Sequence, residues 1–219
     1  MTPTTDAAHA MRHAMVASQL RTNSVNDARI LEAMSTEPRE RFLPEQHREI
    51  AYRDTLLPLN GGRRHNSPLV IGRLLTEAHV ASGEKVLVIG AAGGYSAAIL
   101  ADVAGSVTAL ESDPELAALA REALAGKAGV TLVEGPLNQG WAADAPYDLI
   151  VIDGAVEEVP EGVMAQLKDG GRVATGIVDR GVTRLATGRK SGSHFSLVPF
   201  ADIECAVLPG FEKAKTFQF

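Results

Sequence analysis

The chain has 219 residues, of which 45% are hydrophobic and 22% are charged, and its formal net charge is −6 at pH 7. These values are those of an ordinary globular protein, and the length favours one compact α/β unit over several domains. The negative charge argues against a nucleic-acid partner, because phosphate contacts need a clustered basic surface. Cys205 is the one cysteine, so an internal disulfide is excluded and we expect a small buried hydrophobe there. No Cys and His residues have zinc-ligand spacing, and we predict no metal.

The start of the chain predicts neither export nor a membrane anchor. Its first ten residues, MTPTTDAAHA, lack the basic start and the apolar stretch of a signal peptide. A run of about 18 apolar residues, long enough to span a membrane, is also missing from the sequence. We therefore expect a cytoplasmic protein without a membrane partner.

Residues 1–68 are predicted to form a helical N-terminal part that ends in a structured loop. Amphipathic spacing extends over 11–57, and Ser24 and Asp27 have the spacing of a helix capping box. The stretch NGGRRHNSP has the Gly, Asn and Pro content of a loop, and a helix is expected to begin at Pro68.

Residues 69–219 are predicted to form the ligand-binding part of the same compact unit. From residue 84, short apolar strands alternate with helical segments, which indicates βαβ units and a parallel sheet. These segments are KVLVIG, GYSAAILADVA, SVTALE, DPELAALAREALAG, VTLVEG and YDLIVIDG. Beyond GGRVATGIV, the strand candidates VTRLAT, HFSLVPF and IECAVL follow without an intervening helix. We expect them to add to the sheet edge in antiparallel fashion.

The stretch VLVIGAAGGYSAA predicts a strand that turns through glycines into a helix, at the edge where open α/β sheets bind ligands. Glu111 ends the next strand, 21 residues after Gly90, where doubly wound folds place an acid that binds ribose hydroxyls. The glycine spacing is not G-x-G-x-x-G and no P-loop lysine is present, so a nucleoside without a pyrophosphate, such as S-adenosylmethionine, fits best. The alternatives are a turn that only permits tight packing and a solvated carboxylate at a strand end.

Several stretches, taken in order, resemble the protein-L-isoaspartate O-methyltransferase family between about residue 15 and about residue 178. They are MVASQLRTNSVNDARILEAMSTEPRERFLPE, AYRDTLLPL, VLVIGAAGGYSAAILA, GWAADAPYDLIVIDGAVEEVP and QLKDGGRV. The resemblance implies a class I methyltransferase, Rossmann-like fold: a mostly parallel central sheet, antiparallel C-terminal strands and a helical N-terminal extension. It also implies S-adenosylmethionine as cofactor over 69–219, and proteins or peptides with an isoaspartyl carboxylate as methyl acceptors.

The family's active-site loop, Gly-Gln-Thr-Ile-Ser-Gln-Pro, aligns with GRRHNSP at 62–68. Asn66 stands at the position of the family's serine, so the resemblance implies that Asn66, Ser67 and Arg64 line the acceptor side as the catalytic residues. An asparagine amide still donates hydrogen bonds, but the larger side chains predict a different substrate pocket. Arg63 and Arg64 either bind the acceptor carboxylate or point into solvent.

The resemblance also implies the cofactor-binding residues. They are Gly90, Ala92, Gly94, Glu111, Pro136 and Leu137. Pro136 replaces an aspartate that holds the adenine in the family, and proline offers neither a carboxylate nor an N–H. Asp153 stands where the family has a threonine, and is either a new polar contact or part of a capped loop.

Three hypotheses therefore stand. The first is a carboxyl methyltransferase of the isoaspartyl-repair type, with an altered acceptor preference as one form of it. The second is a non-catalytic homologue that binds S-adenosylmethionine or regulates a partner. The third is a nicotinamide-dependent oxidoreductase, which would need a pyrophosphate grip. The oligomeric state is left open, as is whether the C-terminal strands pair within one chain or across a dimer.

Overall fold

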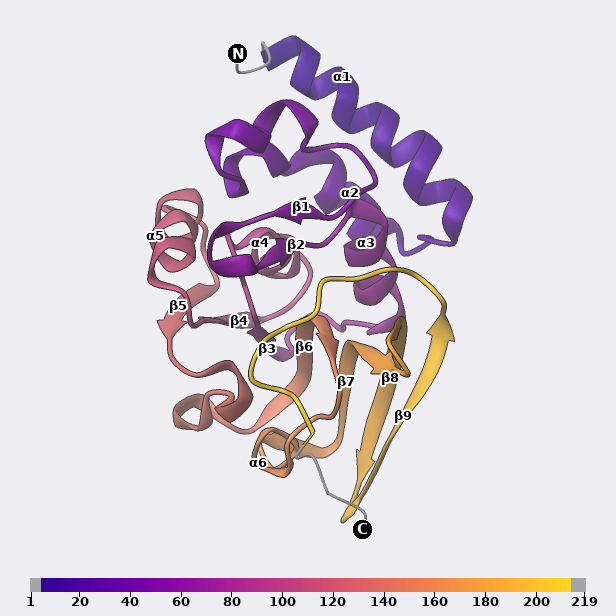
Figure 1. Cartoon of the computed structure of the whole chain (residues 1–219), viewed down its shortest axis with the longest axis vertical. Coiled ribbons are helices and arrows are strands. Elements are labelled where there is room, and N and C mark those ends of the chain that lie inside the picture. The colour runs from indigo at the N-terminus through magenta and orange to yellow at the C-terminus, as the bar shows by residue number, and fades with distance from the viewer. Residues whose placement is uncertain (1–4, 214–219) are drawn as a thin grey trace.

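The computed structural model describes residues 5–213 as a seven-stranded sheet with helices on its faces and a helical N-terminal part above it (Figure 1). The helices are α1 (Thr5–Met15), α2 (Ala28–Thr36), α3 (Pro68–Glu77), α4 (Tyr95–Ala101), α5 (Pro114–Ala123) and α6 (Glu161–Met164). The strands of the large sheet are β3 (Lys85–Ile89), β4 (Ser106–Glu111), β5 (Val130–Glu134), β6 (Tyr147–Val156), β7 (Leu167–Asp179), β8 (Val182–Ser191) and β9 (His194–Ala201). No helix among the described residues is both long and apolar enough to cross a membrane.

The strand order is β5-β4-β3-β6-β7-β8-β9. Neighbouring strands from β5 to β7 are parallel, whereas β8 pairs antiparallel with β7 and β9 pairs antiparallel with β8. The predicted fold, a mostly parallel sheet with antiparallel C-terminal strands and a helical N-terminus, is therefore confirmed. These C-terminal strands pair within one chain.

The prediction for IECAVL is wrong, because this segment is not a strand at the sheet edge. Residues 203–208 turn back over the carboxyl end of β6 and make one isolated parallel bridge, between Val207 and Ala155. In Figure 1 the yellow chain that follows β9 runs back across the sheet towards β6 and β3.

Local sequence signals explain where the helices begin. Ser67 accepts a hydrogen bond from the backbone N–H of Val70, 3.4 Å away, and Pro68 starts α3 as predicted. Asp113 caps α5 in the same way. The predicted capping box is wrong, because Asp27 itself caps α2 and Ser24 has a left-handed backbone with φ of 64° at the end of the preceding turn.

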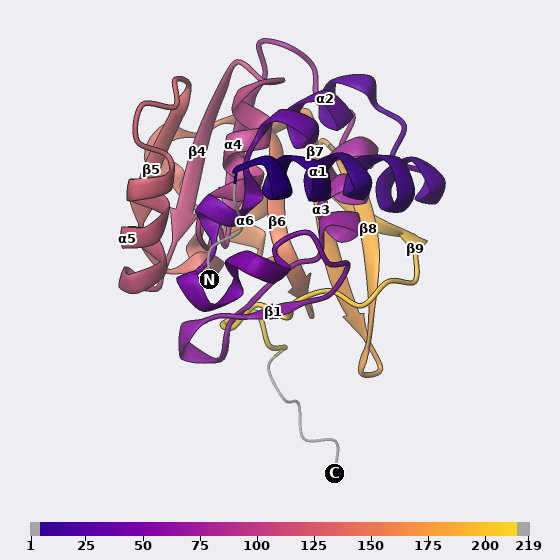
Figure 2. The same ribbon diagram turned by 90° about the horizontal axis from the view of Figure 1, so that it is seen from above.

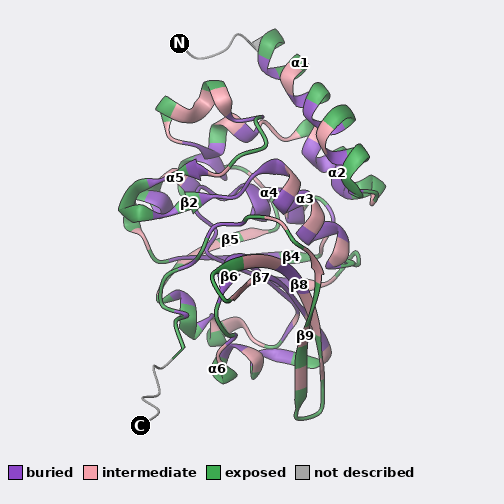
Figure 3. Cartoon of the chain, turned by 45° about the vertical axis from the view of Figure 1, so that its right-hand side comes forward, coloured by how far each residue is buried: buried purple, intermediate pink, exposed green. Residues whose placement is uncertain are grey.

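Two apolar cores lie on the two faces of the sheet. Alternate residues of β3 point to opposite faces: Val86 and Val88 pack with the N-terminal helices, α3 and α4, and Leu87 and Ile89 pack in the second core. Figure 3 shows the buried strands in the middle of the molecule and the exposed hairpin of β8 and β9 beside them. Seen from above in Figure 2, α1 to α3 cover one face of the sheet.

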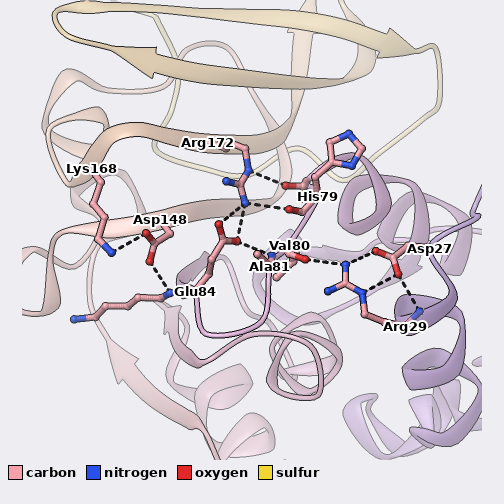
Figure 4. A network of polar contacts seen from close by, with 11 residues as sticks. Asp27, Arg29, His79, Val80, Ala81, Glu84, Asp148, Lys168 and Arg172 are labelled. Atoms are coloured by element: carbon pink, nitrogen blue, oxygen red, sulfur yellow. Dashed lines mark hydrogen bonds and ion pairs between the residues drawn. The ribbon is translucent and has the colours of Figure 1, made fainter.

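The N-terminal part is tied to the sheet by a polar network at the amino ends of the strands (Figure 4). Arg172 of β7 donates to both carboxylate oxygens of Glu84, at 2.7 and 2.9 Å, and to the backbone oxygens of Ala78 and His79. Arg29 of α2 donates to the carbonyl of Val80 at 2.8 Å. This network lies at the opposite strand ends from Gly90 and Glu111, which leaves the carboxyl ends to the site.

Candidate functional site at the carboxyl ends of β3, β4 and β6

The glycine turn, residues 90–94, leaves β3 and enters α4. Gly90 has a φ of 79° and Gly94 a φ of 97°, both in the left-handed region where glycine is favoured. Gly93 is required by packing, because a Cβ there would lie 2.0 Å from the carbonyl oxygen of Phe42. Ala92 has a left-handed φ of 49° although it carries a Cβ.

Glu111 lies at the carboxyl end of β4 and is completely buried. One carboxylate oxygen accepts from the backbone N–H groups of Ser112 and Asp113, at 2.8 and 3.0 Å. The other accepts from the N–H of Ala92 at 2.7 Å, so the carboxylate joins the glycine turn to β4. The alternative of a solvated carboxylate is therefore wrong.

Arg63 comes from the loop between β1 (Leu57–Pro58) and β2 (Arg64–His65) and binds Glu111. Its two terminal nitrogens donate to the two carboxylate oxygens at 2.9 and 3.3 Å, and its side chain is only 6% exposed. Such a two-pronged pair is the geometry that a guanidinium favours. The alternative that Arg63 points into solvent is wrong, because its guanidinium is buried against Glu111, and binding of an acceptor carboxylate by Arg63 stays a prediction. Arg64 does point outwards, with 54% of its side chain exposed and an ion pair to Glu204 at 3.4 Å.

Asn66 is buried and both ends of its amide are engaged. Its nitrogen donates to Asp153 at 2.7 Å, and its oxygen accepts from the N–H of Ala206 at 2.8 Å. Ser96 of α4 donates to the second oxygen of Asp153 at 2.5 Å. Burial raises the pKa of Asp153, and the hydrogen bonds from Ser96 and Asn66 counter part of that rise. Asp153 is thus a buried polar contact of the loop.

Arg39 and His65 are buried beside Asn66, and neither was predicted from the sequence as a site residue. Arg39 is fully buried and donates to the carbonyls of Ala51 and Asn66 at 2.8 and 2.5 Å. It also lies 3.1 Å from Nδ1 of His65, and that nitrogen is 3.0 Å from the carbonyl oxygen of Asn66, so the tautomer of His65 decides which of the two contacts is a hydrogen bond. Burial and the neighbouring guanidinium of Arg39 lower the pKa of His65 to about 3. A buried arginine among helical residues gives no signal in the sequence that would reveal this contact.

The other predicted site residues differ in how far they are buried. Ser67 is buried and its hydroxyl caps α3. Leu137 is buried in the second core together with Leu110 and Leu208, whereas Pro136 is exposed. Both follow Gly135, whose N–H donates to the carbonyl of Glu111 at 3.1 Å. The structure therefore gathers the predicted residues at the ends of β3, β4 and β6, with Arg64 and Pro136 at the rim.

A C-terminal stretch, residues 205–211, covers this edge of the sheet, and we call it the closing segment. Ala155 of β6 donates to the carbonyl of Ala206 at 2.6 Å and accepts from the N–H of Leu208 at 2.9 Å. Leu208 is buried, and its side chain would lie 2.9 Å from a Cβ on Gly90 and 2.6 Å from one on Gly154. Burial raises the pKa of Cys205 to about 12, which keeps this buried thiol protonated and unreactive.

The residues at this edge of the sheet fit a ribose-containing ligand. A carboxylate accepts hydrogen bonds from two adjacent hydroxyls, and the glycine at position 90 leaves room for close backbone approach. In the described conformation, however, Arg63 holds both oxygens of Glu111 and Leu208 lies against Gly90.

A sequence model of protein-L-isoaspartate(D-aspartate) O-methyltransferases matches residues 11–201. The chain belongs to this family. Its membership confirms the resemblance found in the sequence.

Two curated relatives illustrate the match across the protein-L-isoaspartate O-methyltransferase family. Protein-L-isoaspartate O-methyltransferase 2 of Anaeromyxobacter sp. (strain Fw109-5) is 42% identical over 164 residues, covering 74% of this chain and 68% of the relative. Protein-L-isoaspartate O-methyltransferase 1 of Rhodopseudomonas palustris (strain HaA2) is 37% identical over 207 residues, covering 93% of this chain and 84% of the relative. Both are named as methyltransferases, and nothing in these names supports the non-catalytic or the nicotinamide hypothesis.

Solved structures of family members share the fold. One protein-L-isoaspartate O-methyltransferase superposes with a TM-score of 0.79 at 23% identity, over 93% of this chain, which spans 66% of the length of that protein. A β-aspartate methyltransferase from Plasmodium falciparum, in complex with S-adenosyl-L-homocysteine, gives a TM-score of 0.73 at 16% identity, over 90% of this chain and 97% of that one. These likenesses show the common architecture.

Proposed function

We propose that this protein is an S-adenosylmethionine-dependent carboxyl methyltransferase that methylates the carboxylate of isoaspartyl residues in damaged proteins. The observation that carries the proposal is Glu111, a buried carboxylate bonded to the glycine turn at the carboxyl end of β4. Open α/β sheets bind ligands at this edge, and a carboxylate there suits the hydroxyls of a ribose. Membership of the family supports the same cofactor and the same acceptor.

The cofactor side comprises residues that follow or end three strands, β3, β4 and β5. They are Gly90, Ala92, Gly94, Glu111, Pro136 and Leu137. Glu111 accepts the ribose hydroxyls, Gly90 allows close backbone approach, and Leu137 supplies an apolar wall. When bound, S-adenosylmethionine supplies a methyl group on a positively charged sulfur.

The acceptor side comprises Asn66, Ser67 and Arg64. A carboxylate acceptor is already an anion, so the protein needs no general base and acts mainly by holding the acceptor in place. Asn66 is oriented by Asp153, and Ser67 fixes the start of α3 beside it. Both therefore belong to a rigid part of the loop, which favours positioning.

Arg64 lies at the entrance for the acceptor. It lines a cavity of about 630 Å³ together with Asp202, Glu204 and Cys205. An arginine paired only loosely with Glu204 at the surface is free to bind the carboxylate of a peptide, because exposed ion pairs contribute little stability. We assign this cavity to the peptide that carries the isoaspartyl residue.

We propose that the protein acts in the cytoplasm and that its partners are its protein substrates. The lone Cys205 fits a reducing compartment, and the net charge of −6 is unfavourable for nucleic acid.

The test is methyl transfer to a synthetic peptide that contains one isoaspartyl residue. With S-adenosylmethionine carrying a labelled methyl group, we expect label to enter this peptide and to be released by mild alkali, as an ester is. The same peptide with a normal aspartyl residue is the control and is expected to stay unlabelled. Equal labelling of both peptides would contradict the proposed acceptor, and labelling of neither would contradict the activity.

A further inference from the structure

The ion pair between Arg63 and Glu111 is sealed from solvent. Glu111 is fully buried and the Arg63 side chain is 6% exposed. Each carboxylate oxygen of Glu111 accepts a hydrogen bond from one terminal nitrogen of Arg63 and also from at least one backbone N–H group. The hydrogen bonds that would bind ribose hydroxyls are thus made by a side chain of the protein itself.

The closing segment covers the same place from the other side. Leu208 belongs to the second core, together with Ile89, Leu110 and Leu137. A Cβ on Gly90 would lie 2.9 Å from a methyl of Leu208 and 3.5 Å from a terminal nitrogen of Arg63. The space above the glycine turn is therefore shared between Leu208 and Arg63.

Asn66 joins the loop to the closing segment. Its amide oxygen accepts a hydrogen bond from the N–H of Ala206, two residues before Leu208. Its amide nitrogen donates to Asp153. Arg63 and Asn66 are two positions at which this loop departs from the family's loop. At both positions this chain has a longer side chain than the family's residue. Each of these side chains donates hydrogen bonds and helps to close the crevice.

We propose that Arg63 and Leu208 form an autoinhibitory latch over the cofactor crevice, and that the cofactor binds only after Arg63 leaves Glu111 and the closing segment lifts. This inference rests on the proposed function, because it assigns the crevice to a nucleoside ligand. With such a latch, the apparent Kd equals the Kd of the open form divided by the fraction of molecules that are open. Breaking it therefore tightens cofactor binding.

The test measures the binding of S-adenosyl-L-homocysteine, which carries no methyl group to transfer, to four purified proteins by calorimetry. They are the parent chain, Arg63→Gln, Leu208→Ala and Val207→Ala. Arg63→Gln restores the family's residue and frees Glu111, and Leu208→Ala opens the space above Gly90. Val207→Ala is the matched control, because Val207 is 55% exposed in the same segment. We expect Arg63→Gln and Leu208→Ala each to bind about tenfold or more tightly than the parent, with Val207→Ala unchanged.

The outcomes separate the latch from the function on which it rests. If all four proteins bind S-adenosyl-L-homocysteine with the same affinity, the latch is wrong and the cofactor site stands. If none of them binds while circular dichroism shows all to be folded, both the latch and the assignment of the crevice are wrong. Using two variants on different elements guards against a loss of folding in one of them.

Hydrogen exchange of the closing segment gives a second readout, independent of turnover. The N–H groups of Ala206 and Leu208 are bonded to Asn66 and Ala155 in the closed form. The latch predicts that saturating S-adenosyl-L-homocysteine makes these two amides of the parent exchange faster, although ligands usually slow exchange. Slower exchange at both amides on binding would overturn it.

Discussion

Glu111 and Arg63 are partners in one ion pair, yet their replacement is expected to change cofactor affinity in opposite directions. Glu111→Gln removes the charged acceptor that the ribose hydroxyls and three backbone N–H groups share. We expect it to bind S-adenosyl-L-homocysteine at least about tenfold more weakly than the parent. The free energy of unfolding should fall by about 1–3 kcal/mol, because the amide NH₂ faces N–H donors. Calorimetry and urea denaturation measure the two effects, and unchanged affinity would remove Glu111 from the site.

His65 is expected to make the protein sensitive to mild acid. Its pKa is lowered to about 3 in the folded chain by burial and by Arg39, against an ordinary value of 6.5. The stability it contributes is present above pH 6.5 and is lost as the pH falls, because protonation then favours the unfolded chain. Between pH 6.5 and pH 4 this loss is on the order of 3 kcal/mol.

The variant His65→Gln isolates this effect. Asp153 lies in the same buried cluster and has a raised pKa, so its contribution is lost as the pH rises above 3.8 and has the opposite sign. Denaturant unfolding of parent and variant at pH 7, 5.5 and 4 should give a difference that shrinks as the pH falls. A difference that stays constant with pH would show that His65 is not held neutral.

At this scale the sequence was sufficient for the position of Glu111 at a strand end beside the glycine turn, but not for its partner. The position of Glu111 follows from strand spacing, which fixes where an acid falls relative to the glycine turn. Arg63 is separated from it by 48 residues, and only the loop path through β1 and β2 brings the two together. The predicted roles of Asn66, Ser67 and Arg64 stay predictions until acceptor binding is measured.

At the scale of elements, the glycine turn is packed directly against the N-terminal part. Gly93→Ala places a Cβ 2.0 Å from the carbonyl oxygen of Phe42, a backbone atom that cannot move without the turn that carries it. We expect the free energy of unfolding to fall by about 2 kcal/mol or more. Gly162→Ala in α6 is the control, because nothing lies within 4 Å of its Cβ position, and its effect should stay within about 0.5 kcal/mol. Thermal unfolding of both variants checks this, and equal effects would contradict it.

Element types were predictable where the pattern is local. Alternation of strands and helices gave the parallel sheet, and Asp113 and Pro68 marked two helix starts. The stretch IECAVL carries the composition of a strand, but composition does not determine its neighbour. It lies over the strand ends because Asn66 and Ala155 offer it hydrogen bonds there.

For the whole molecule, the site depends on segments far apart in the sequence. The loop at 60–67 brings Arg63 and Asn66, the sheet brings Glu111 and Asp153, and the closing segment brings Leu208. The division of the chain at residue 68 stays a prediction. The loop before that boundary contacts the sheet after it, so the two parts act on one site.

The most direct test is a crystal structure of the parent chain with S-adenosyl-L-homocysteine at saturating concentration. We expect the ribose hydroxyls to lie on Glu111, with Arg63 displaced from that carboxylate and Leu208 withdrawn from Gly90. A bound ligand that leaves the pair between Arg63 and Glu111 intact would contradict it.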